Sequence, residues 1–72
     1  MPKANIKNEI RRLRFEKGEM TQQELADRTG CTRQTIIMLE QGRYVPSLAL
    51  ALRIAYAFGI SVDDIFTLDQ SD

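Results

Sequence analysis

Arg33, Gln34 and Met38 have the side chains and the spacing of residues that read the edges of DNA bases. On a helix, Met38 lies one turn after Gln34, and the three residues share a face. Arginine pairs bidentately with guanine and glutamine with adenine, each pair discriminating by about 1–3 kcal/mol, and methionine contacts thymine methyl groups. The alternative is that Arg33 and Gln34 are simply solvated polar residues at an exposed helix start. The two-helix pattern around them favours base contact.

Two neighbouring residues on this segment allow more than one interpretation. Thr35 can reach a base or a phosphate, or it can complete the start of the helix. Ile37 is apolar like Met38, and an exposed helix face rarely carries two adjacent apolar side chains. We expect Ile37 to pack sideways against the loop around Tyr44, which leaves Met38 as the DNA contact.

Residues 21–40 predict two short helices joined by a tight turn, and this pair of helices must position the base-reading face. Thr21 and Glu24 have the spacing of a capping box, in which each side chain bonds the backbone N–H of the other residue. Gly30 favours a left-handed stop, and Thr32 is a good N-cap for the second helix. The break is about three residues long, which is typical of a helix-turn-helix.

The rest of the sequence predicts a scaffold of three further helices and no strand. We expect a helix from Asn5 to about Lys17, one from about Leu48 to Phe58 that is capped by Ser47, and a short one after Ser61. The predicted inner stripe of the second of these helices consists of Leu48, Ala51, Leu52, Ala55 and Phe58. Residues 1–5 are expected to form a loose arm and residues 68–72 a frayed tail.

The length and charge of the chain indicate one small domain with an uneven charge distribution. The 72 residues carry ten basic and ten acidic side chains. Residues 1–60 hold all the bases and six of the acids, a net charge of +4, and residues 61–72 hold the other four acids. Exposed charges more than about 8 Å apart are largely screened from one another at physiological salt. A local basic face is therefore compatible with phosphate binding even though the net charge of the chain is zero. We expect weak non-specific DNA affinity and a shallow salt dependence.

Several function classes are disfavoured by composition. The chain has one cysteine, Cys31, and no histidine, so we expect no metal site, no cofactor and no internal disulfide. It contains no nucleophile–base pair and no phosphate-cradling glycine loop, so we do not expect an enzyme. No segment is apolar enough to span a membrane and no signal peptide is visible, so we expect a cytoplasmic, nucleoid-associated protein.

Over residues 6–67, the sequence resembles the phage-repressor and Cro-like (XRE-type) helix-turn-helix regulators. The matching stretches are RRLRFEKG, MTQQELADRTGCTRQTIIMLEQGRYVPS and LALRIAYAFGISVDDIF. The resemblance implies an all-α, five-helix lambda-repressor-like DNA-binding domain around one core. It also implies that the second helix of the motif lies in the major groove and that dimers bind operator sites.

The resemblance also implies roles for residues outside the base-reading face. Gln22 matches a position that binds the DNA backbone and braces the recognition helix, and a helix start favours phosphate in any case. Arg43 and Tyr44 match positions that touch phosphate, although a solvated loop is an alternative for Arg43. Arg14 and Glu40 match positions that form a structural ion pair between the first helix and the end of the recognition helix.

The fourth helix carries more apolar residues than one inner stripe needs. A helix that is apolar on two sides usually has two partners. The second partner is either the fifth helix or another subunit, and a symmetric dimer would place two recognition helices about 34 Å apart. We expect the dimer interface to contain Leu50, Ile54, Phe66 and Leu68.

These observations predict a sequence-specific regulator of transcription that binds double-stranded DNA. In this hypothesis the protein is a repressor, and a homodimer inserts the helix from about Arg33 to Gln41 into the major groove. The alternative is an antitoxin or bridging protein whose main partner is another protein. The neutral net charge and the apolar fourth helix keep that alternative open.

Overall fold

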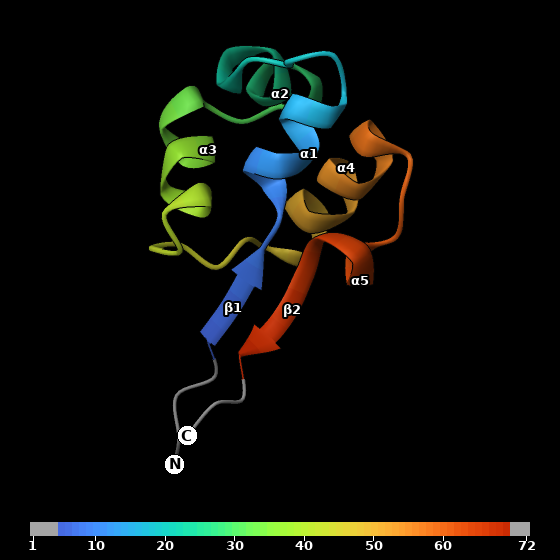
Figure 1. Cartoon of the computed structure of the whole chain (residues 1–72). Coiled ribbons are helices and arrows are strands. Elements are labelled where there is room, and N and C mark those ends of the chain that lie inside the picture. Colours follow the sequence, from blue (N-terminus) through green and yellow to red (C-terminus); the bar gives the residue numbers. More distant parts are fainter. Residues whose placement is uncertain (1–4, 70–72) are drawn as a thin grey trace.

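The computed structural model describes residues 5–69, which form five helices and a two-stranded sheet (Figure 1). The elements in chain order are β1 (Asn5–Asn8), α1 (Ile10–Glu16), α2 (Gln22–Thr29), α3 (Arg33–Glu40), α4 (Leu48–Phe58), α5 (Val62–Ile65) and β2 (Phe66–Asp69). The helices pack together, and the sheet extends from one end of them (Figure 1). This is the five-helix arrangement that the sequence predicts, with a small sheet added.

The two-helix motif begins and ends where the local signals place it. The Thr21 hydroxyl accepts from the Glu24 backbone N–H at 3.0 Å, and the Glu24 carboxylate accepts from the Thr21 N–H at 3.2 Å. Gly30 adopts a left-handed conformation with φ of 71°, which strains any residue with a side chain. Thr32 then caps α3. Residues 21–40 therefore form a helix-turn-helix.

The terminal sheet corrects the expected helix over residues 5–17. Residues 5–8 form β1, which pairs antiparallel with β2 so that Ile6 lies opposite Leu68 and Asn8 lies opposite Phe66. Ile6 and Ile10 do have helical spacing. The backbone hydrogen bonds of residues 5–8 are nevertheless made to β2 and not within a helix. The predicted frayed tail is also corrected at residues 68 and 69, which belong to β2. The rest of that tail and residues 1–4 of the predicted arm lie outside the described residues.

The core lies where α4 meets the other helices, and the orientation of α4 differs from the expected one. Leu50 and Ile54 are 7% and 0% exposed, whereas Leu48 and Leu52 are 74% and 52% exposed. Both pairs repeat at helical spacing, so periodicity alone could not decide which pair faces inward. Leu50 and Ile54 are core residues, which corrects the prediction that they line a dimer interface. The buried side of α4 consists of Leu50, Ala51, Ile54, Ala55 and Phe58.

Candidate nucleic-acid interface

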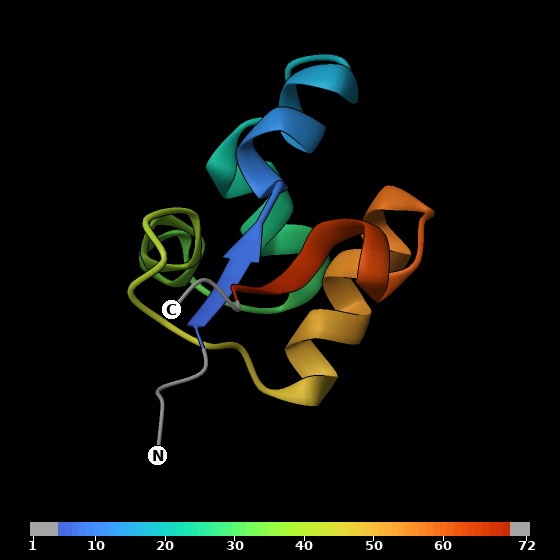
Figure 2. The same ribbon diagram turned by 60° about the horizontal axis from the view of Figure 1, so that its bottom comes forward.

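The outer face of α3 carries the predicted base-reading side chains and is open to solvent. Ile36 and Leu39 anchor the opposite face of the helix in the core, each 0% exposed. Arg33 and Gln34 are exposed on the first turn, and Met38 is half-buried one turn later. Figure 2 looks along α3 and shows it at the edge of the molecule, on the other side from α4. A ligand can therefore reach this face without any rearrangement of the core.

Thr35 completes the start of α3. Its backbone N–H donates to the Thr32 hydroxyl at 3.2 Å, and the two hydroxyl groups lie 3.0 Å apart. This is the second of the two interpretations that the sequence allows for Thr35. A contact between Thr35 and DNA stays a prediction. In such a contact the Thr35 hydroxyl would bond DNA while it also contacts the Thr32 hydroxyl.

Ile37 lies on the side of α3 that faces α1 and α2. It lines a surface hollow of about 310 Å³ together with Phe15 and Gln22. The half-buried state of Ile37 agrees with packing rather than with full exposure. The expected packing of Ile37 against the loop around Tyr44 stays a prediction.

Arg14 and Glu40 form a buried ion pair between α1 and the last turn of α3. The Arg14 Nε donates to Glu40 Oε2 at 2.6 Å and Nη2 donates to Oε1 at 3.0 Å, while Nη1 donates to the Met20 carbonyl at 2.8 Å. The two side chains are 10% and 9% exposed. A carboxylate at a helix C-terminus is disfavoured by the helix dipole, and the guanidinium offsets that cost.

Gln22 joins the same network from the first turn of α2. Its Nε2 donates to Glu40 Oε1 at 3.1 Å, so Gln22 braces the last turn of α3. Gln22 and Thr21 also line a hollow of about 540 Å³ together with Arg33. The hollow therefore lies between the positive end of α2 and a cation on α3, where a phosphate group is favoured.

Arg43 and Tyr44 follow α3 in an exposed loop. The Arg43 backbone N–H donates to the Met38 carbonyl at 3.0 Å, which keeps the chain next to the end of α3. Both side chains are exposed, Tyr44 by 42%. Both side chains are therefore accessible to a DNA phosphate. The contact with phosphate stays a prediction.

Arg12 differs from these basic residues because its charge is paired on its own helix. Its Nη1 donates to Glu16 at 2.9 Å and its Nε donates to Glu9 at 3.1 Å. These hydrogen bonds, that to Glu16 foremost, raise the pKa of Arg12. The paired charge is the structural reason to keep Arg12 out of the candidate interface.

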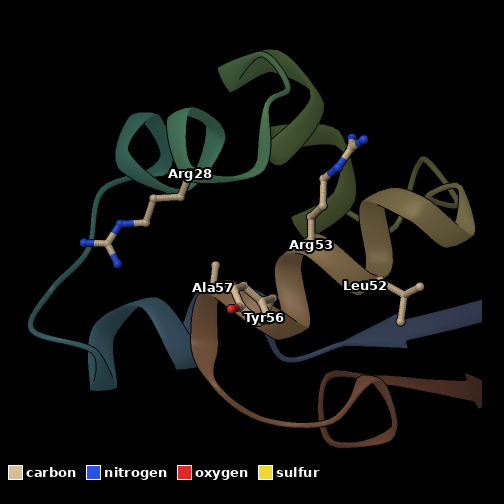
Figure 3. A pocket seen from close by; sticks show the side chains of 5 residues that line it. All are labelled: Arg28, Leu52, Arg53, Tyr56 and Ala57. Carbon is tan, nitrogen blue, oxygen red and sulfur yellow. The ribbon is translucent and has the colours of Figure 1, made fainter.

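The second apolar side of α4 is present, as the sequence predicts, but it contains Leu48 and Leu52, which were expected to face the core. Leu48, Leu52 and Tyr56 repeat every four residues and are exposed, Tyr56 by 90%. A hollow of about 520 Å³ is lined by Leu52, Tyr56 and Ala57 together with Arg28 and Arg53 (Figure 3). The sequence shows this repeat, but it does not show whether this repeat or that of Leu50 and Ile54 faces the core.

The two remaining predicted interface residues, Phe66 and Leu68, lie on β2. Phe66 is half-buried and packs against the core. Leu68 is 58% exposed on β2. The described residues contain no group of three His, Cys, Asp or Glu side chains that could hold a metal ion. None of the helices formed by residues 5–69 has the length and apolarity needed to cross a bilayer.

Comparison with known proteins adds a family match and several similar chains. A helix-turn-helix family model matches residues 10–65. An uncharacterized HTH-type transcriptional regulator of Methanothermobacter thermautotrophicus is 61% identical over 62 residues, covering 85% of this chain and 88% of the relative. An uncharacterized HTH-type transcriptional regulator of Archaeoglobus fulgidus is 50% identical, with 78% and 79% covered. One of Bacillus subtilis is 42% identical over 67 residues, with 93% and 100% covered.

Proposed function

Because the chain belongs to the Cro/C1-type (XRE) helix-turn-helix family of DNA-binding transcriptional regulators, we propose that it is a sequence-specific repressor. In this proposal a homodimer binds double-stranded DNA and inserts α3 into the major groove. The observation that carries the proposal is the pair of exposed side chains, Arg33 and Gln34, on the outer face of a helix that is anchored on its other side.

The dimensions of α3 suit this placement. Eight helical residues span about 12 Å, and the major groove is about 12 Å wide. Arg33 and Gln34 would pair with a guanine and an adenine, and Met38 would contact a thymine methyl group. Thr35 would contribute a base or phosphate contact from the same turn. Sequence preference would then follow from these side chains rather than from net charge.

Phosphate contacts would hold α3 in register. Gln22 and the hollow that it shares with Arg33 would take one phosphate, and Arg43 with Tyr44 would take another on the far side of the helix. Contacts of this kind fix orientation and carry no base information. A bound homodimer would occupy DNA that a polymerase needs, which is the physical basis for repression.

We propose that the homodimer forms through the exposed side of α4. The interface would contain Leu48, Leu52 and Tyr56, because Leu50 and Ile54 are buried in the core. An exposed apolar stripe of this kind is typical of a protein interface. A two-fold axis would bring the same stripe of two protomers together, which makes the interface self-complementary. Leu68, exposed on β2, would extend it. The dimer would present its two α3 helices to successive major grooves about 34 Å apart.

Selection of bound duplexes from a random pool tests the proposal. The expected result is a near-palindromic site whose two halves are about one helical turn apart. Sedimentation of the same preparation should report a dimer. An antitoxin or bridging protein is the second candidate, and the 90% exposure of Tyr56 on an apolar stripe favours it. A monomer that enriches no duplex would support this second candidate and contradict the first.

A further inference from the structure

We infer that Asn8, which lies outside the helix-turn-helix, is a positioning residue for DNA recognition by α3. Its amide Nδ2 donates to the Leu39 carbonyl at 2.7 Å, and its Oδ1 accepts from the Ile10 backbone N–H at 3.1 Å. One half-buried side chain thus joins β1, the start of α1 and the last turn of α3. The inference rests on the proposed insertion of α3 into the major groove.

The last turn of α3 receives side-chain hydrogen bonds from three other elements of the fold. Asn8 holds the Leu39 carbonyl, and Arg14 and Gln22 hold the neighbouring Glu40 carboxylate. These three side chains come from β1, α1 and α2. The exposed first turn of α3, which carries Arg33 and Gln34, lies at the opposite end. The burial of Ile36 and Leu39 holds α3 against the core, and the polar contacts that add to this burial are made at its C-terminal end.

A small tilt of α3 about its last turn produces a large displacement of the side chains on its first turn. Arg33 is six residues before Leu39, a distance of about 9 Å along the helix axis. A tilt of about 10° at Leu39 would move Arg33 by about 1.6 Å, whereas a recognition geometry needs to be held within about 0.5 Å. Among the polar contacts, the Arg14–Glu40 pair fixes one point, at the last residue of α3. Asn8 supplies a second point of attachment at Leu39, and two points restrict the tilt.

The amide is the group that serves both contacts. Its oxygen forms a turn with the N–H two residues on, as Asn and Asp both do, and its nitrogen donates to the carbonyl of α3. An aspartate would keep the acceptor for Ile10 and would lose the donor for Leu39. Asn8→Asp therefore separates the local turn before α1 from the attachment of α3.

Lys7 offers a matched control. It is the neighbouring residue of β1, and its side chain points to the other face of the strand. Lys7→Gln lowers the net charge by one, as Asn8→Asp does. The pair that it removes, Lys7 Nζ to Asp69 at 3.8 Å, is mostly exposed on the lysine side, and exposed pairs stabilise little.

The experiment compares the 72-residue wild type, Asn8→Asp and Lys7→Gln by mobility shift at a temperature at which circular dichroism shows all three folded. The probes are the duplex that the wild type selects from a random pool and a scrambled duplex of the same composition. We expect Asn8→Asp to lower the ratio of selected to scrambled affinity by about three- to tenfold. Lys7→Gln should weaken both duplexes together and leave the ratio unchanged.

An equal ratio for Asn8→Asp and Lys7→Gln would overturn the inference while leaving the proposed function intact. A wild type without preference would overturn both. If Asn8→Asp does not fold, Asn8→Ser replaces it with the same expectation and the same contradicting result. The serine hydroxyl keeps an acceptor near Ile10 but ends one bond short of the amide nitrogen that reaches Leu39.

Discussion

Replacing Arg14 by methionine should destabilise the fold far more than any exposed charge does. The Glu40 side chain is 9% exposed in the wild type, and the change leaves its carboxylate with only the Gln22 amide as a hydrogen-bond donor. Removing one partner of a buried pair costs about 3–5 kcal/mol. A chain of 72 residues has about 4–11 kcal/mol of total stability. The variant should therefore lose a large share of its unfolding free energy.

Urea unfolding followed by far-UV circular dichroism measures this loss. Arg12→Met is the matched control, because Arg12 lies on the same helix and its ion pairs with Glu9 and Glu16 are about half exposed. We expect the control to unfold near the wild-type midpoint. The double variant Arg14→Met, Glu40→Leu should recover most of the stability, because two packed apolar side chains leave no buried charge.

Equal unfolding midpoints for Arg14→Met and Arg12→Met would refute this reasoning. Such a result would mean that the Glu40 carboxylate reaches water in solution and that α3 is held in place without the Arg14 guanidinium.

Three further predictions concern the DNA contacts and the proposed dimer. Gln34→Ala should relax the preference at one base position with unchanged circular dichroism, and an unaltered selected sequence would contradict the docking of α3. Arg43→Ala should weaken all duplexes about equally and reduce the salt slope by about 1, which a titration over salt concentration measures. Tyr56→Lys places a third cation beside Arg28 and Arg53 and should give a folded monomer in sedimentation. A dimer of unchanged affinity would exclude the α4 surface.

The helix-turn-helix could be predicted from the sequence because its signals are local. The Thr21–Glu24 box, the Gly30 stop and the Thr32 cap each depend on residues within a few positions of one another. The same holds for Ser47 and Gly59, which cap the two ends of α4. Exposure of Arg33 and Gln34 follows once those boundaries are known, because Ile36 and Leu39 must face inward.

The terminal sheet and the orientation of α4 could not be predicted in this way. The strand partner of Ile6 is Leu68, more than sixty residues away, and no local pattern marks the pair. On α4, Leu48 and Leu52 compete with Leu50 and Ile54 as equally apolar stripes, and only the packing of the other helices decides between them. The contact from Asn8 to the Leu39 carbonyl likewise depends on the fold and leaves no signature in residue types.

The ratio of specific to non-specific DNA affinity tests the central claim most directly. The measurement titrates the 72-residue protein against its selected duplex and against bulk competitor at one physiological salt concentration. Recognition through the outer face of α3 predicts a ratio of about a thousand or more, lost when Arg33 and Gln34 are both replaced by alanine. A wild type that binds every duplex alike, or a double variant that keeps the ratio, would contradict the claim.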